Sequence, residues 1–319
     1  MNRLTVLAAG IGCTALSSGA FGCSSCGCTL NSDWSSQGYT TSSGLHWDLR
    51  YDYFDQSELR SGTRSVSRSE VALPAEQEVQ HNTINRNLTL GLDYSPARNW
   101  GVNVLIPYFD RPHITYDEGE TELSGSHSRG LGDVRVVARY QGFQPDLSIG
   151  VQFGLKLPTG EIGDTFRSGP LAGETVDRGL QLGTGTTDLL LGLYTVHSLG
   201  GSFAYFGNLL WQQPLNSRND FKPGAGVNLT LGLRYTSVLP AGMSPQLQVN
   251  VRAEKRESGA NADIPNSGAT LAYISPGLGF KLSDRLDGFA FVQVPIYQRV
   301  NGLQLEPRVL SSVGLRYRF

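Results

Sequence analysis

Three cysteines lie close together near the N-terminus, at Cys23, Cys26 and Cys28, and their thiols are the most chemically distinctive groups in the chain. If the chain is exported to an oxidising compartment, these three thiols can be in several chemical states, because an odd number of cysteines cannot all pair within the chain. These are a Cys23–Cys26 disulfide with Cys28 left over or joined to another chain, a soft-metal site for Cu(I) or zinc, and acylation of Cys23. Haem attachment is disfavoured, because it needs a histidine where Gly27 stands. The cofactor is therefore unknown, with a soft metal as one prospect.

A second set of reactive side chains consists of charged residues that alternate with apolar ones. Alternation with period two is typical of strands, and if such strands close into a barrel these charges face its interior. There they either pair as salt bridges that fill the lumen or line a pore whose arginine excess favours anions. The sequence leaves both interpretations open. The candidate lumen residues are Asp48, Arg50, Asp133, Arg135, Arg139, Lys156, Asp188, Arg234, Arg252, Glu254, Arg316 and Arg318.

Histidines give no sign of a catalytic site. None of the five stands in a recognisable nucleophile or metal motif, so we expect that the chain is not an enzyme. A net charge of −2 gives no basic excess for nucleic acid, which we exclude as a partner. The histidines are His46, His81, His113, His127 and His197.

Residues 1–22 have the features of an export signal. Arg3 supplies a basic start, Leu4 to Leu16 form a short apolar stretch, and Ala20 and Gly22 are small residues suited to cleavage. The apolar stretch is too short for a membrane-spanning helix, which needs about 20 residues. We expect removal of residues 1–22, Cys13 included, which leaves residues 23–42 as a periplasmic cysteine-containing segment.

Alternation of apolar and polar residues dominates the rest of the chain. Leu45, Trp47 and Leu49 alternate with His46 and Asp48, and period two predicts strands with one apolar and one polar face. About twelve such runs follow one another, and single-chain bacterial barrels have an even number of strands. The runs lie near residues 45–53, 84–94, 100–106, 134–140, 147–157, 189–193, 203–211, 227–235, 247–251, 274–280, 290–296 and 309–319.

The connections between these runs alternate in length, as they do in outer-membrane barrels with long extracellular loops and short periplasmic turns. Residues 43–319 are therefore predicted to form an all-β, transmembrane, antiparallel up-and-down β-barrel. A soluble β-sandwich is the alternative, disfavoured by the number of runs and by aromatic residues at their ends. Arg86 is the one clear lipid-facing charge within a run, near the extracellular rim. The long connections are 56–80, 111–129, 158–185, 214–223, 256–268 and 299–305; the short ones lie near 95–99, 142–145, 198–201, 238–243 and 283–287.

Two short motifs resemble a known family. The segment from Gly154 to Gly160 (GLKLPTG) and that from Gly183 to Asp188 (GTGTTD) are similar to outer-membrane channels associated with phenol and other aromatic degradation pathways. This resemblance covers the chain from about residue 43 onward and implies a transporter-like barrel. The cysteine segment is not part of the family pattern.

At the C-terminus, Tyr317 and Phe319 end an alternating run that resembles the signal read by the barrel-assembly machinery. The expected location is the outer membrane, and the expected partners are its lipid, including lipopolysaccharide, the assembly machinery and small solutes. The predicted function is a channel or transporter for small solutes. The alternative is a plugged barrel that anchors a metal- or redox-active three-cysteine segment in a binding or assembly role.

Overall fold

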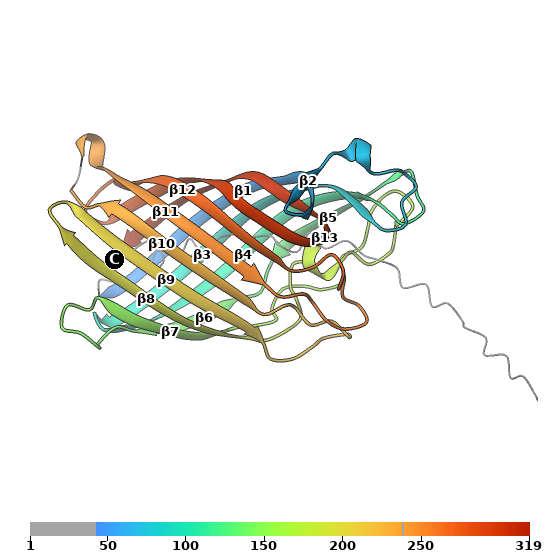
Figure 1. The fold of residues 1–319 in the computed structure, drawn as a ribbon. Helices are drawn as coiled ribbons and strands as arrows, with labels where there is room; N and C mark the ends of the chain where they lie inside the picture. The colour runs from blue at the N-terminus through green and yellow to red at the C-terminus, as the bar shows by residue number, and fades with distance from the viewer. Residues whose placement is uncertain (1–42, 238) are drawn as a thin grey trace, which may run out of the picture.

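The computed structural model describes residues 43–237 and 239–319, which form one closed antiparallel β-barrel (Figure 1). Each ring strand pairs with the next along the chain, and β13 pairs with β1 to close the ring. The signal segment 1–22, the segment 23–42 and their cysteines lie outside the described residues. The ring strands are β1 (Gly44–Gly62), β3 (Val79–Ala97), β4 (Trp100–Tyr116), β6 (Arg135–Tyr140), β7 (Ile149–Lys156), β8 (Asp188–Gly200), β9 (Phe203–Pro214), β10 (Gly226–Tyr235), β11 (Met243–Glu254), β12 (Ala269–Lys281) and β13 (Leu286–Arg318).

Strand β13 crosses the barrel wall twice. Its first half pairs with β12 as far as Val300, and its second half pairs with β1 from Val300 to Arg318, antiparallel in both cases. The chain reverses next to Gly302, whose φ of 60° is one that glycine adopts readily. A closed ring of antiparallel neighbours must have an even number of crossings, and β13 counted twice makes this number even. The sequence prediction of an antiparallel barrel with about twelve strands is confirmed.

In the described part of the chain, two short strands and three short 3₁₀ turns lie off the ring path. Strand β2 (Arg64–Val66) pairs with the end of β1, and β5 (Leu123–Leu131) pairs with β4 beyond β6, so that β5 and β6 follow one another along the same edge of β4. The 3₁₀ turns are η2 (Arg68–Glu70), η3 (Arg178–Leu180) and η4 (Pro240–Gly242). No helix in residues 43–237 or 239–319 is long and apolar enough to cross a membrane.

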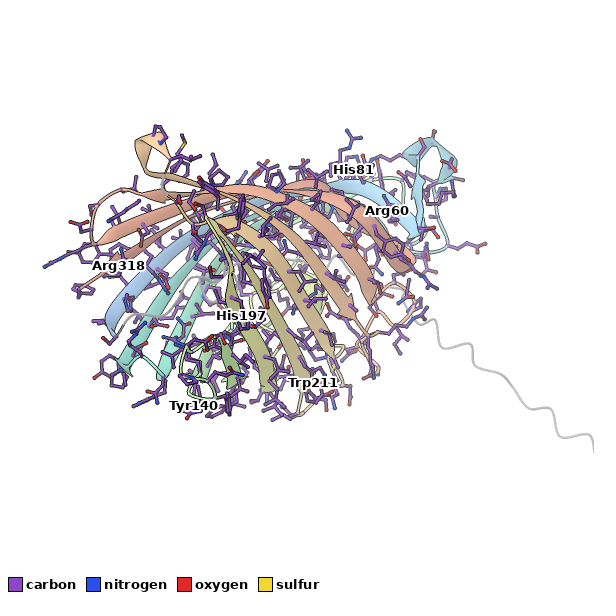
Figure 2. All side chains as sticks on the ribbon, turned by 60° about the vertical axis from the view of Figure 1, so that its left-hand side comes forward. Arg60, His81, Tyr140, His197, Trp211 and Arg318 are labelled. Atoms are coloured by element: carbon purple, nitrogen blue, oxygen red, sulfur yellow. The ribbon has the colours of Figure 1, made fainter. Side chains whose placement is uncertain are left out.

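Apolar side chains cover the outside of the barrel, as Figure 2 shows with Tyr140 and Trp211 labelled. Phe153, Leu193 and Leu231 are each more than half exposed, at 57%, 56% and 53%. Soluble monomers rarely expose a continuous apolar surface of this kind. The alternation therefore places the apolar face toward lipid and the polar face inward, as in outer-membrane barrels and opposite to a soluble sandwich.

Long and short connections lie at opposite ends of the barrel, as predicted. Gly44 and Phe319 both lie at the short-turn end. There the Phe319 amide donates a hydrogen bond to the carbonyl oxygen of Leu45 at 3.1 Å. Three of the predicted long loops contain runs of strand residues, and one of them, 299–305, lies wholly within β13 although the chain reverses there. Much of 111–129 is β4 and β5, and part of 56–80 is the end of β1 with β2. Strand pairing here continues beyond the apolar wall, where polar side chains on both faces hide the alternation.

Candidate functional site

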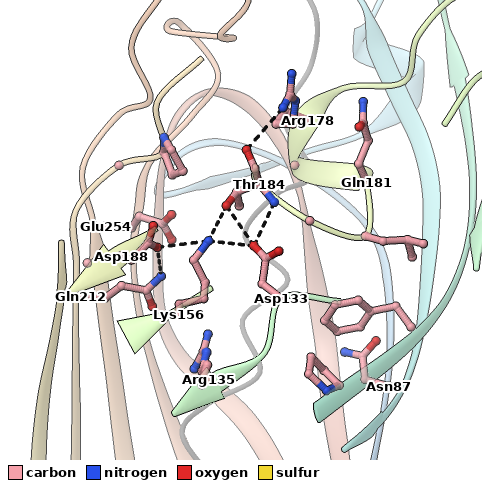
Figure 3. Close-up of a pocket in the computed structure, with 18 of the residues that line it drawn as sticks. Asn87, Asp133, Arg135, Lys156, Arg178, Gln181, Thr184, Asp188, Gln212 and Glu254 are labelled. Carbon is pink, nitrogen blue, oxygen red and sulfur yellow. Dashed lines mark hydrogen bonds and ion pairs between the residues drawn. The ribbon is translucent and has the colours of Figure 1, made fainter. Parts of the chain in front are cut away.

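A cavity of about 210 Å³ lies inside the barrel, between the inner wall and the connection of residues 157–187 (Figure 3). We call this connection the inner loop. One side of the cavity is apolar, with Leu105, Pro107 and Phe109 of β4. Charged side chains form much of the rest: Arg50, Arg111, Asp133, Arg135, Lys156, Arg178, Asp188, Arg252, Glu254 and Glu257.

The inner loop folds into the lumen because it has its own apolar core. Phe166, Leu171, Val176 and Leu180 pack together as buried residues, and the ring of Phe166 lies 6.3 Å from that of His113 on the inner wall. Polar contacts add to this packing. The Nη1 atom of Arg111 donates to the carbonyl oxygens of Gly179 and Gln181, at 3.0 and 3.4 Å.

The two ends of the inner loop pass back to back. A Cβ atom on Gly160 would come within 2.7 Å of the Cα of Gly183, and one on Gly183 would come within 2.4 Å of the carbonyl oxygen of Gly160. Only glycine allows this approach. The two motifs that carry the family resemblance are thus brought side by side at the base of the loop.

Asp133 and Lys156 fasten this base to the wall. Asp133 accepts hydrogen bonds from the amides of Gly160 and Thr184, both at 3.0 Å, and its Oδ2 lies 2.8 Å from the Nζ of Lys156. Lys156 also lies 3.4 Å from the Oδ2 of Asp188 (Figure 3). All three charged side chains are buried, so each ion depends on the others for compensation.

Other predicted lumen residues form ion pairs on the inner wall. Arg316 makes two contacts with Asp48, at 2.5 and 2.7 Å, while Arg252 pairs with Glu254 at 2.5 Å. The structure adds three acids that the candidate set omitted: Asp52 pairs with Arg50 at 2.8 Å, Asp93 with Arg139, and Asp287 with Arg318 at 2.8 Å.

These added acids were detectable in the sequence. Asp52 and Asp93 have the same parity as the inward residues of their runs, so the alternation itself places them on the polar face. With them, acids and bases on the inner wall nearly balance. Arg111 was missed for a different reason, because it lies where the sequence pattern predicts a loop rather than β4.

Arg135 differs from these paired residues. Within the described chain, Arg135 makes no hydrogen bond and no ion pair, and its guanidinium enters the cavity with no dashed contact in Figure 3. Arg234 instead lines a smaller cavity between β10, β11 and β12, together with Lys281 and Asp287. The predicted lumen residues therefore do not form one site: Asp48, Arg139, Arg234, Arg316 and Arg318 are not among the residues that line the main cavity.

The inner loop also carries a carboxylate in an acidic environment. Burial raises the pKa of Asp177 well above its usual range, and the charges of Glu78, Asp263 and Glu257 raise it further. One oxygen of Asp177 has no hydrogen-bond partner among the residues that the structure describes. Protonation therefore favours the docked position of the loop.

At the end of the barrel wall, Tyr317 and Phe319 lie in edge contact, with ring centroids 5.1 Å apart, and Tyr317 stacks on Trp47 at 6.0 Å. The side chain of Phe319 is exposed on the outside. Both aromatic rings therefore lie at the seam where β13 closes against β1.

No protein-family model and no curated protein matches this sequence. Among solved structures, the chain is similar to an outer-membrane channel from Pseudomonas putida F1, with 14% identity, a TM-score of 0.61, and coverage of 88% of this chain and 98% of that one. It is also similar to the β domain of the Bordetella autotransporter BrkA, with 15% identity, a TM-score of 0.50, and coverage of 87% and 100%. The outer-membrane β-barrel fold that the sequence resemblance implies is confirmed. Since one match is a channel and the other an autotransporter domain, the fold alone does not assign a solute.

Proposed function

We propose that this barrel is a channel that carries small solutes across the outer membrane, and that the solute passes through the cavity beside the inner loop. The observation that carries this proposal is the guanidinium of Arg135, which enters the cavity and forms no ion pair with any residue in 43–237 or 239–319. Structural ion pairs account for Arg50, Lys156 and Arg252 on the same wall. A guanidinium that has no such partner among the described residues can bind an anionic group of a solute.

The lining favours small organic anions that have an apolar body. The guanidinium of Arg135 supplies two parallel N–H donors that can bind a carboxylate or a similar group in bidentate geometry. Beside it on β4, Leu105, the cross-strand partner of Arg135, and Pro107 and Phe109 present apolar surface to the remainder of the molecule. Aromatic carboxylates combine these two properties, and the resemblance to channels of aromatic degradation pathways supports the same class.

Conductance in planar bilayers tests the channel function. Purified protein is expected to give discrete current steps in KCl, and benzoate is expected to reduce them more than benzyl alcohol, which lacks the carboxylate. Arg135→Gln is expected to remove this difference while the channel still conducts. Current no greater than that of a detergent blank would contradict the channel function. Equal block by the acid and the alcohol would contradict only the solute class.

We assign no catalytic role, in line with the sequence expectation and with the channel among the structural matches. The alternative role, an anchor for a three-cysteine segment, concerns residues outside the described chain and stays a prediction.

A further inference from the structure

A group of charged residues lies on the outside of the barrel, on β3, β4, β5 and the inner loop. Strand register places Arg86 opposite Asp110, and Asp110 opposite Arg129. His127 lies two residues before Arg129 on β5, and Arg167 of the inner loop donates to the carbonyl oxygen of His127 at 2.8 Å. We call these five residues the outer-wall cluster. None of them lines the lumen cavity.

The outer-wall cluster lies just beyond the apolar band of the wall. The row of outward residues below it is apolar or aromatic, with Leu88, Tyr108 and Leu131 paired across the same strands. Asp110 follows Trp100, at the short-turn end of β4, by ten residues. At about 3.3 Å per residue and a tilt of about 40°, this separation corresponds to about 25 Å along the barrel axis, which is the height of the apolar band. The cluster therefore lies at the level of the outer-leaflet headgroups.

Internal contacts orient the cluster but leave most of its positive charge uncompensated. Asp110 contacts His127 at 2.6 Å and Arg86 at 3.6 Å, and is the one carboxylate among the five residues. Arg129 is held by a neutral oxygen, donating from Nε to the hydroxyl of Tyr108 at 2.9 Å, and Arg167 is likewise held by a carbonyl. Three arginines therefore face one carboxylate.

Exposure keeps these side chains available. The side chains of Arg86 and His127 are 41% and 36% exposed, and Arg129 and Arg167 are also exposed. A cation on this face has only a small cost near the membrane boundary. Neither burial nor ion pairing in the barrel explains why three arginines gather here.

We propose that the outer-wall cluster binds phosphate groups on the saccharide headgroup of an outer-leaflet lipid, the chemistry of lipid A in lipopolysaccharide. Guanidinium groups match phosphate oxygens in bidentate geometry, and arginines already oriented by Tyr108 and His127 lose less freedom on binding. The acyl chains of the same lipid lie along the apolar row formed by Leu88, Tyr108 and Leu131. This site is separate from the lumen and does not depend on the proposed channel function.

The test measures lipid binding to the purified, folded protein in detergent by native mass spectrometry. Three probes are compared: bis-phosphorylated lipid A, the same lipid after removal of its phosphates, and inorganic phosphate. The triple variant Arg86→Gln, Arg129→Gln, Arg167→Gln removes the cluster arginines. The matched control, Arg64→Gln, Arg256→Gln, Arg308→Gln, removes the same charge from exposed arginines elsewhere.

The cluster variant is expected to bind phosphorylated lipid A about tenfold more weakly, as for loss of charge-assisted bonds, and the control about as well as the unmodified protein. Dephosphorylated lipid A should bind both alike. Equal loss in the control, or no loss in the cluster variant, would overturn the proposal. Displacement of the lipid by millimolar inorganic phosphate would show a free-anion site instead and would overturn the lipid assignment.

Asp110→Asn provides a second variant with the opposite expected sign. It removes the one carboxylate of the cluster, so binding of phosphorylated lipid A should become tighter, while binding of dephosphorylated lipid A should not change. A residue with a purely structural role would not give this selective gain. Heat-modifiable gel mobility confirms that each variant is folded, and if the triple variant does not fold, Arg129→Gln and Asp110→Asn must shift the affinity in opposite directions for the proposal to stand.

Discussion

Arg111 on the inner wall and Gly179 in the inner loop are joined by a hydrogen bond from Nη1 to the carbonyl oxygen, 3.0 Å long. The same guanidinium donates through Nε to Asn85 at 2.8 Å, so one side chain ties the loop to two neighbouring strands of the wall. The width of the lumen at this level therefore depends on whether Arg111 holds the loop.

Replacing Arg111 should loosen the inner loop. Arg111→Met keeps the aliphatic stem but removes the donors, and a hydrogen bond from a charged group contributes about 1.5–3 kcal/mol. We expect a larger mean conductance and more current noise in planar bilayers, since the loop leaves its docked position more often. Arg308→Met, which changes an exposed arginine outside the lumen, serves as the control. Identical current traces for both variants would contradict a role for the loop in setting the conductance.

Lys156→Met should destabilise the barrel strongly. The variant leaves Asp133 and Asp188 buried without the cation that now lies 2.8 and 3.4 Å from them. Removing one member of a buried ion pair costs about 3–5 kcal/mol. Urea unfolding in lipid vesicles is expected to show this loss, and the double variant Lys156→Met, Asp133→Asn should recover part of it. An unchanged unfolding midpoint for the single variant would show that water replaces the lysine at little cost.

Arg135 and Arg139 should differ in their effect on ion selectivity, although both come from β6. Arg135 makes no ion pair within the described residues, whereas Arg139 is paired with Asp93. Arg135→Gln is expected to shift the reversal potential in a KCl gradient toward cations, because it removes from the lumen a positive charge that no described residue pairs. Arg139→Gln should change the reversal potential little and lower stability instead. The reverse ranking would mean that the ion pair, not the free guanidinium, controls selectivity.

The conductance should rise with pH through Asp177. Because the pKa of Asp177 is raised in the docked loop, docking is favoured while the carboxyl is protonated. Docking weakens as pH increases from the ordinary pKa of aspartate toward the raised value, since the charged form is buried near Glu78, Asp263 and Glu257. Current recorded between acid and neutral pH should therefore increase, and Asp177→Asn should flatten the profile. Glu174→Gln, on the exposed side of the same loop, is the control, and an equal effect of both variants would refute the assignment.

Deletion of Phe319 should block insertion of the barrel. The residue ends the closing strand, with its amide bonded to Leu45 and its ring against Tyr317. We expect a loss of heat-modifiable protein from outer-membrane fractions, because the deletion removes the amide hydrogen bond to Leu45 and the ring contact with Tyr317 at the seam where β13 closes against β1. Phe319→Tyr keeps an aromatic ring at this position and should assemble. Normal amounts of folded protein from the deletion would show that the terminal residue is not needed.

The sequence by itself determined the barrel fold and, for nearly every strand residue, whether its side chain points to the outside or the inside of the barrel. Alternation has a period of two, so one assigned position, such as Leu49 outward, fixes the face of Asp48 and Arg50 as well. The difference between long and short connections added the orientation of the two ends. These patterns are local in the sequence, so they can be interpreted without knowing which strands are neighbours.

Only the tertiary structure decided which charges compensate one another. Asp48 and Arg316 are 268 residues apart and meet because closure pairs β1 with β13 in one register. The inward fold of residues 157–187 was likewise undetermined, since it depends on Arg111 and His113 of β4 and on Asp133 in the connection before β6. The outer-wall cluster has the same origin: Arg86, Asp110 and Arg129 become neighbours through strand register, and a pattern with period two carries no information about the register between strands.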